Sequence, residues 1–220
     1  MRQTKALLRA IGSVLLLSLL SAAQNGKVES TGALTDSAVP EAVRQSLDAK
    51  GYRLTLDDPK PTCELWLRKS VPAQAKKDSE LAYPQIPESA LVAVIHFFQT
   101  AGDFRGHQVP AGFYTLRYAL IPDDGNHLGV SPNRDFLLLI PAQSDSDPSA
   151  TFKFQELVAM SAKTAGAKHP SPLSFPPADK ASAGAVAKDD QDHWIFSAAL
   201  KLASGDELPF ALIVKGTAQQ

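Results

Sequence analysis

Hydrophobic and polar positions alternate with a period of two along much of the chain, which is the pattern of β-strands that bury one face. Residues 63–71 show it clearly, because Leu65 and Leu67 fall on the same side of an extended chain. Residues 90–98 are apolar on both sides except at His96, as expected of a central strand that is covered on both faces. The sequence predicts strands over residues 52–56, 63–71, 90–98, 113–121, 135–140, 194–202 and 208–215.

Two segments have helical signals instead. Residues 40–51 begin with proline, place the apolar residues Val43 and Leu47 four positions apart and end with glycine. Residues 152–165 carry apolar residues at helical spacing and are followed by Gly166, a typical helix stop. Both segments are predicted to be short amphipathic helices.

Seven strands and two helices without regular strand-helix alternation favour a mainly β fold, namely a single antiparallel β-sandwich with two short peripheral helices. One domain is predicted over residues 40–220. Residues 24–39 lack apolar periodicity and are predicted to form a flexible lead-in. Residues 167–192 are rich in proline and contain an acidic cluster, which predicts a long surface loop.

The first 23 residues have the pattern of a secretory signal peptide. Basic residues precede a short apolar run at 11–20, and small residues at 21–23 supply a cleavage site before Gln24. The apolar run is about half of the ~20 residues that span a bilayer. We therefore expect an exported protein, periplasmic or extracellular, with no transmembrane segment in the mature chain.

Charge and cysteine content narrow the classes of function further. The chain has 22 basic and 23 acidic residues and a net charge of -1, so no basic excess points to nucleic acid as a partner. Cys63 is the only cysteine, which leaves stability to a hydrophobic core without an intrachain disulfide. Because Cys63 alternates with leucines on one strand face, it is predicted to be a buried, inert thiol.

Polar groups are densest between residues 96 and 135. The candidate binding residues in this segment are His96, Asp103, His107, Asp123, Asp124, Asn126, His127, Arg134 and Asp135. Loops at one end of a sandwich can bring such side chains together, and two or three of them could then bind a divalent metal. The favoured alternative is that they are turn residues and a hydrogen-bonded core histidine.

Known catalytic and cofactor motifs are absent from the sequence. It contains no CxxC pair, no HExxH, no phosphate-binding glycine loop and no GxGxxG. No catalytic residue, no metal ligand and no cofactor is therefore assigned. Trp66, Tyr114 and Tyr118 form either a stacking platform for a sugar or part of the core.

Three stretches carry a resemblance to known proteins. PAGFYTLRYALIPDDGNHLGVSPNRDFLLLIPA at 110–142, GYRLTL at 51–56 and CELWLRKSV at 63–71 resemble segments of a group of exported, β-rich bacterial proteins of unknown function. The resemblance implies an exported β-rich domain and carries over no catalytic residue.

The function expected from these patterns is that of an exported noncatalytic binding or structural module of the cell envelope or extracellular space. Its ligand is unknown, with a carbohydrate or an envelope component as candidates. The alternative is a metal-dependent hydrolase that uses the polar cluster between His96 and Asp135.

Overall fold

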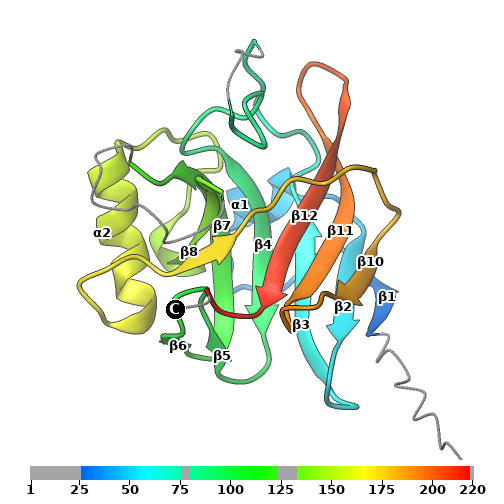
Figure 1. Cartoon of the computed structure of the whole chain (residues 1–220). Coiled ribbons are helices and arrows are strands. Elements are labelled where there is room, and N and C mark those ends of the chain that lie inside the picture. Colours follow the sequence, from blue (N-terminus) through cyan, green and yellow to red (C-terminus); the bar gives the residue numbers. More distant parts are fainter. Residues whose placement is uncertain (1–25, 76–79, 123–132, 219–220) are drawn as a thin grey trace, which may run out of the picture.

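The computed structural model describes residues 26–75, 80–122 and 133–218 and consists mainly of antiparallel β-sheets (Figure 1). The larger sheet has seven strands, in the spatial order β1 (Lys27–Thr31), β2 (Gly51–Thr55), β3 (Pro61–Leu67), β4 (Leu91–Phe97), β7 (Gly112–Leu120), β8 (Asp135–Pro141) and β9 (Pro172–Ser174). The smaller sheet has the order β10 (Ala185–Lys188), β11 (Trp194–Lys201) and β12 (Glu207–Lys215). A short hairpin joins β5 (Ala101–Gly102) to β6 (Gln108–Val109).

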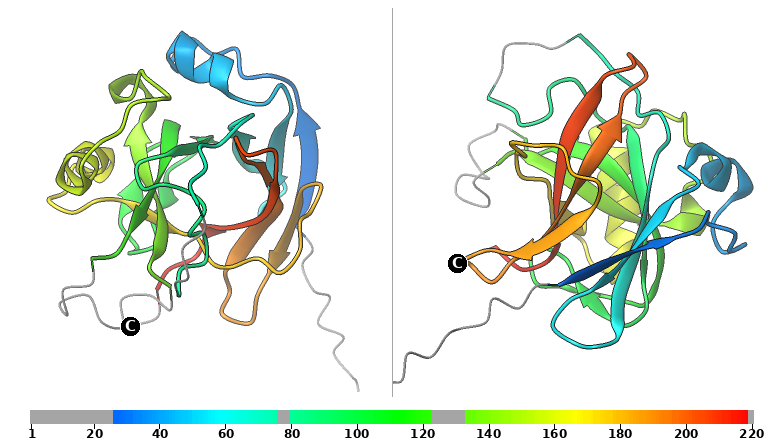
Figure 2. Two further views of the ribbon diagram at one scale, coloured as in Figure 1. Left: turned by 90° about the horizontal axis from the view of Figure 1, so that it is seen from above. Right: turned by 90° about the vertical axis from the view of Figure 1, so that its right-hand side faces the viewer.

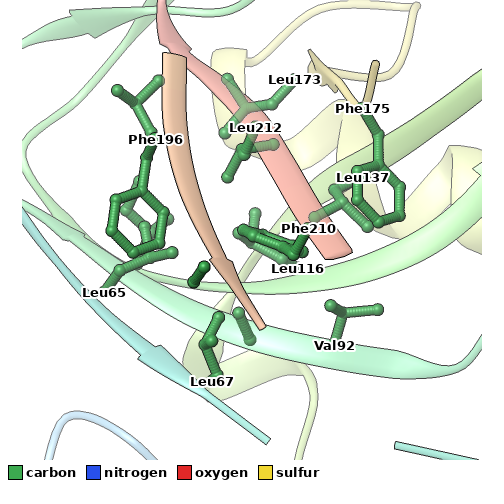
Figure 3. Close-up of a cluster of buried hydrophobic side chains, with 14 of the residues drawn as sticks. Leu65, Leu67, Val92, Leu116, Leu137, Leu173, Phe175, Phe196, Phe210 and Leu212 are labelled. Atoms are coloured by element: carbon green, nitrogen blue, oxygen red, sulfur yellow. The ribbon is translucent and has the colours of Figure 1, made fainter. Parts of the chain in front are cut away.

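The two sheets pack face to face around one hydrophobic core. Leu65, Leu116 and Leu137 project from the larger sheet toward Phe196 and Phe210 of the smaller one (Figure 3). The larger sheet also curves, so that its edge strands β1 and β9 lie beside β10 and β12 of the smaller sheet (Figure 2). The predicted mainly β sandwich is confirmed, and all seven predicted strands are present.

The outer face of the larger sheet is covered by two helices. α1 (Glu41–Ser46) contributes Val43 to a cluster with Trp66 and Val94, and α2 (Phe154–Ala165) contributes Leu157 to a cluster with Leu138. A 3-10 turn, η1 (Ala142–Ser144), follows β8. Strands β4 and β8 are apolar on both sides because one face meets the inner core and the other meets these outer layers.

The helix boundaries follow their capping signals. α2 ends where Gly166 adopts a left-handed conformation with φ of 61°, which a glycine accepts without a Cβ penalty. α1 is shorter than predicted, because Leu47 is already extended and pairs with Arg68 in an isolated bridge. None of the helices in the described ranges has the length and apolar character needed to cross a membrane.

Two predicted loops contain strands. The segment 24–39, predicted to be a flexible lead-in, includes β1, which pairs along β2, and Val39, which is buried. The segment 167–192, predicted to be a surface loop, includes β9 and β10, and its Phe175 lies in the core. Both predictions are corrected: short edge strands are held by backbone hydrogen bonds and need no apolar periodicity of their own.

Candidate functional site

The structure separates the residues of the predicted polar cluster. His96 lies on the outer face of β4, where its ring stacks on Phe113 with centroids 4.0 Å apart. Its Nδ1 atom is 3.8 Å from Oε2 of Glu64, and Arg53 pairs with that glutamate at 2.7 Å. This arrangement joins β2, β3 and β4. Asp103 and His107 lie instead between β5 and β6, and Asp135 lies at the start of β8. Asp123, Asp124, Asn126 and His127 lie outside the described residues.

Asp135 points into the protein and is only 1% exposed. Its carboxylate accepts a hydrogen bond from the Tyr118 hydroxyl at 2.6 Å and from the backbone N–H groups of Ala82 and Tyr83 at 3.1 Å each. The carboxylate therefore ties β7 and the segment before β4 to the start of β8. Both carboxylate oxygens of Asp135 accept hydrogen bonds inside the fold, and the contact of Asp135 with an outside ligand stays a prediction. Its neighbour Arg134 donates from Nε to the carbonyl of Ile121 at 3.0 Å.

Replacement of Asp135 by alanine tests this structural role. Three donors lose their acceptor, so the free energy of unfolding should fall by about 1–3 kcal/mol. Asp206, an exposed aspartate in the β11–β12 turn, provides the matched control, because Asp206→Ala removes the same group from a solvated site. Urea titration of both variants measures the difference. Equal stability of Asp135→Ala and the unmodified protein would contradict the structural role.

Asp103 and His107 shape the turn between β5 and β6. The buried Asp103 accepts the N–H groups of Arg105 and His107 through Oδ1, both at 2.9 Å, and its Oδ2 lies 3.2 Å from Nδ1 of His107. Gly106 completes the turn with φ of 84°. This pattern is typical of an aspartate that stabilises a tight hairpin turn. The turn fixes the position of Phe104 and Arg105.

Phe104 is the point at which three distant segments meet. Its N–H donates to the carbonyl of Pro172 at 2.8 Å, and its carbonyl accepts the N–H of Ala218 at 2.8 Å. The segment that carries Ala218 is also held at Thr217, whose carbonyl lies 3.0 Å from Nε2 of the buried His193. The β5–β6 turn, the start of β9 and the segment after β12 are thereby joined next to α2.

These segments enclose an apolar groove of about 320 Å³ beside α2. We call it the α2 groove. Its walls come from the β5–β6 turn, the ends of β7 and β8, one side of α2, the connection to β9 and the segment after β12, which lie together beside α2 in Figure 1. The lining residues are Phe104, Arg105, Ala119, Leu120, Ile121, Pro122, Phe136, Leu138, Phe154, Val158, His169, Pro170, Pro172 and Ala218. Almost all of this surface is hydrocarbon.

Only two of the groove's lining residues have ionisable side chains. Arg105 and His169 are both exposed, which places them where the groove opens to solvent. Among the described residues neither side chain has a hydrogen bond or an ion pair. No acidic side chain lines the groove in the part of the chain that the structure describes. Arg105 therefore places a positive charge at the edge of an apolar depression.

A second depression, of about 500 Å³, lies near β2 and β11 and is polar. Its cations already have partners: Lys201 lies 3.7 Å from Asp48, and Lys50 donates to the carbonyl of Ala183 at 3.3 Å. Arg68 donates to the carbonyl of Pro148 at 2.8 Å. The lining combines these cations with the carboxylates of Asp48 and Glu207, so this depression does not select one class of ligand.

A buried ion pair holds the outer layer to the larger sheet. Both Arg117 and Asp145 are essentially inaccessible, and the guanidinium donates from Nε and Nη2 to the two carboxylate oxygens at 2.7 Å each. Thr115 donates to the same carboxylate at 2.7 Å. The remaining guanidinium protons go to the backbone carbonyls of Ser89, Ala150 and Asp147. The pair is fully satisfied and serves the fold.

The remaining candidate groups are structural as well. Cys63 is buried, as predicted, and burial raises the pKa of its thiol to about 12, with a smaller contribution from the charge of Glu64. The thiol is therefore protonated at neutral pH and a poor nucleophile. Trp66, Tyr114 and Tyr118 are all at most 6% exposed, so the prediction of a stacking platform is wrong and its core-packing alternative is confirmed.

Within the described ranges, no group of three or more His, Cys, Asp or Glu side chains is arranged to hold a metal ion. No family model, curated protein or solved structure matches this chain. The function therefore has to be inferred from the geometry of the site alone, and the metal-dependent hydrolase stays a prediction.

None of the fourteen groove residues is among the nine candidate residues chosen from the sequence. Of those candidates, Asp103 precedes the groove residue Phe104, and Arg134 donates to the carbonyl of the groove residue Ile121. The sequence signal for the groove lies at residues 119–122 and 136–140. Apolar residues there occupy both faces of the strands instead of alternating with polar ones. An outer strand face that is only partly covered by a helix leaves part of this apolar surface open.

Proposed function

We propose that this chain is a noncatalytic module that binds a small apolar molecule in the α2 groove. The composition of the groove carries the proposal: twelve of its fourteen lining residues have apolar side chains, and they form a concave surface. Its volume of about 320 Å³ falls at the lower end of the ~300–1,000 Å³ typical of small-molecule sites.

The noncatalytic part of the proposal rests on the polar groups of the groove. General acid-base catalysis needs a positioned proton donor or acceptor beside the reacting atoms. In the described lining, Arg105 and His169 are the ionisable groups, and both lie at the solvent edge. The walls are formed by side chains such as those of Phe136 and Leu138, which can contact an apolar ligand but cannot donate or accept a proton.

We further propose that the module acts outside the cytoplasm, in the periplasm or beyond the cell. The basic start, the short apolar run and the small residues at 21–23 support export.

The neutral apolar dye phenylnaphthylamine tests the binding function, because its fluorescence rises when it leaves water. Titration of the protein should give a saturable signal. Val158→Arg places a charge on the α2 wall of the groove and should weaken dye binding at least about tenfold, the equivalent of 1.4 kcal/mol.

The matched control is Ala159→Arg, which adds the same side chain to the next residue of α2, an exposed position outside the groove. This variant should bind the dye like the unmodified protein. Far-ultraviolet circular dichroism confirms that both variants are folded. Absence of a saturable signal in the unmodified protein, or equal weakening by both substitutions, would overturn the proposed function.

A further inference from the structure

We infer that the α2 groove selects an apolar molecule that carries a carboxylate at one end. This inference rests on the proposed function and deepens it by naming the class of ligand. The apolar tail would lie against Ala119, Phe136 and Val158, and the carboxylate would lie at the groove opening beside Arg105 and His169.

The position of Arg105 is set by the fold. Its backbone N–H is held by Asp103, and the preceding residue, Phe104, is hydrogen-bonded on both sides, to Pro172 and to Ala218. The backbone of Arg105 is thus fixed at the groove edge while its guanidinium remains exposed and without a partner among the described residues. A fixed backbone reduces the entropy that is lost when the side chain binds a ligand.

Among the described lining residues, Arg105 and His169 can carry a positive charge and none carries a carboxylate, which favours an anionic group over a cationic one. Asp103 is the acidic residue closest in sequence to Arg105, and its carboxylate is already occupied by the two N–H groups of the turn and by the His107 ring. The exposed Lys168 precedes His169 in the sequence. A guanidinium presents two parallel N–H donors that match the two oxygens of a carboxylate, whereas an alcohol can use only one of them.

The size of the groove restricts the apolar part. A volume of about 320 Å³ corresponds to about ten water molecules at ~30 Å³ each. This suits one medium-length acyl chain or one small ring system. Decanoate, with ten carbons and a single carboxylate, is a suitable probe.

Isothermal titration calorimetry with three ligands of equal chain length tests the inference: decanoate, decanol and decyltrimethylammonium. Decanoate should bind about 3- to 10-fold more tightly than decanol, the range for a charge-assisted contact at a partly exposed site. Decyltrimethylammonium should bind most weakly. Arg105→Gln should remove most of the preference for decanoate, because the affinity for decanoate falls by more than the affinity for decanol.

Lys180→Gln is the control, because it removes one exposed positive charge that does not line the groove. It should keep the preference for decanoate. Equal binding of decanoate and decanol to the unmodified protein, or a preference for the cationic ligand, would overturn the inference while the proposed function stands. Absence of binding of all three ligands, together with absence of dye binding, would overturn both.

Discussion

Replacement of Arg117 by methionine is expected to lower the free energy of unfolding by about 3–5 kcal/mol. The guanidinium is inaccessible and supplies both contacts to Asp145, at 2.7 Å each. Methionine fills a similar volume without charge. Among the described residues, Thr115 would then be the one side-chain donor left to the buried carboxylate of Asp145. A buried charge without a counter-ion is far more costly than an exposed one.

Urea titration of Arg117→Met measures the loss, and two further variants identify its cause. Arg117→Met combined with Asp145→Leu should be less destabilised than the sum of the two single variants, because no unpaired charge remains. Lys27→Met removes one partner of an exposed pair with Glu29 and should change stability little. A loss of under about 1 kcal/mol in Arg117→Met would show that the pair does not hold the outer layer to the sheet.

Ile95→Ala should cost about 2–5 kcal/mol, because the substitution removes three methyl or methylene groups from the inner core and leaves a cavity. Ile95 is fully buried in β4 and lies between Leu65 of β3 and Tyr114 of β7. β4 is paired with β3 on one side and with β7 on the other, so the backbone cannot move easily to fill the cavity that the substitution leaves. The change in the midpoint of a denaturant titration reports the loss.

Ile195→Ala is the matched control for this core substitution. Ile195 in β11 is only half-buried, so the same truncation should cost clearly less. If Ile95→Ala lost less than about 1 kcal/mol, or less than Ile195→Ala, the position of β4 at the centre of the core would be contradicted.

The main strands could be predicted from the sequence because their side chains repeat with the period of the sheet. Leu65 and Leu67 of β3 share the inner face, and Gly166 ends α2, as the local patterns indicate. β1 and β10 were missed for a physical reason. They are edge strands of mostly small or polar residues, and backbone pairing to β2 and β11 holds them.

The candidate site was harder to predict, because its residues are brought together only by the tertiary fold. Phe104, Ala119, Val158 and Ala218 lie far apart in the sequence and line one groove. None of their local patterns distinguishes an open apolar surface from a covered one. Asp135 illustrates the opposite difficulty: a polar residue at a strand start is typical of a turn, yet here its carboxylate is buried as an acceptor.

The binding of decanoate to the α2 groove is tested most directly by heteronuclear NMR titration of the isotope-labelled protein. Decanoate bound in the groove should cause saturable shifts of the backbone amides of Phe104, Leu120, Val158 and Ala218. The amides of Lys50, Tyr52 and Lys201 in the polar depression should change little. Shifts confined to the polar depression, or no saturable shifts in the groove, would contradict the assignment of the groove as the binding site.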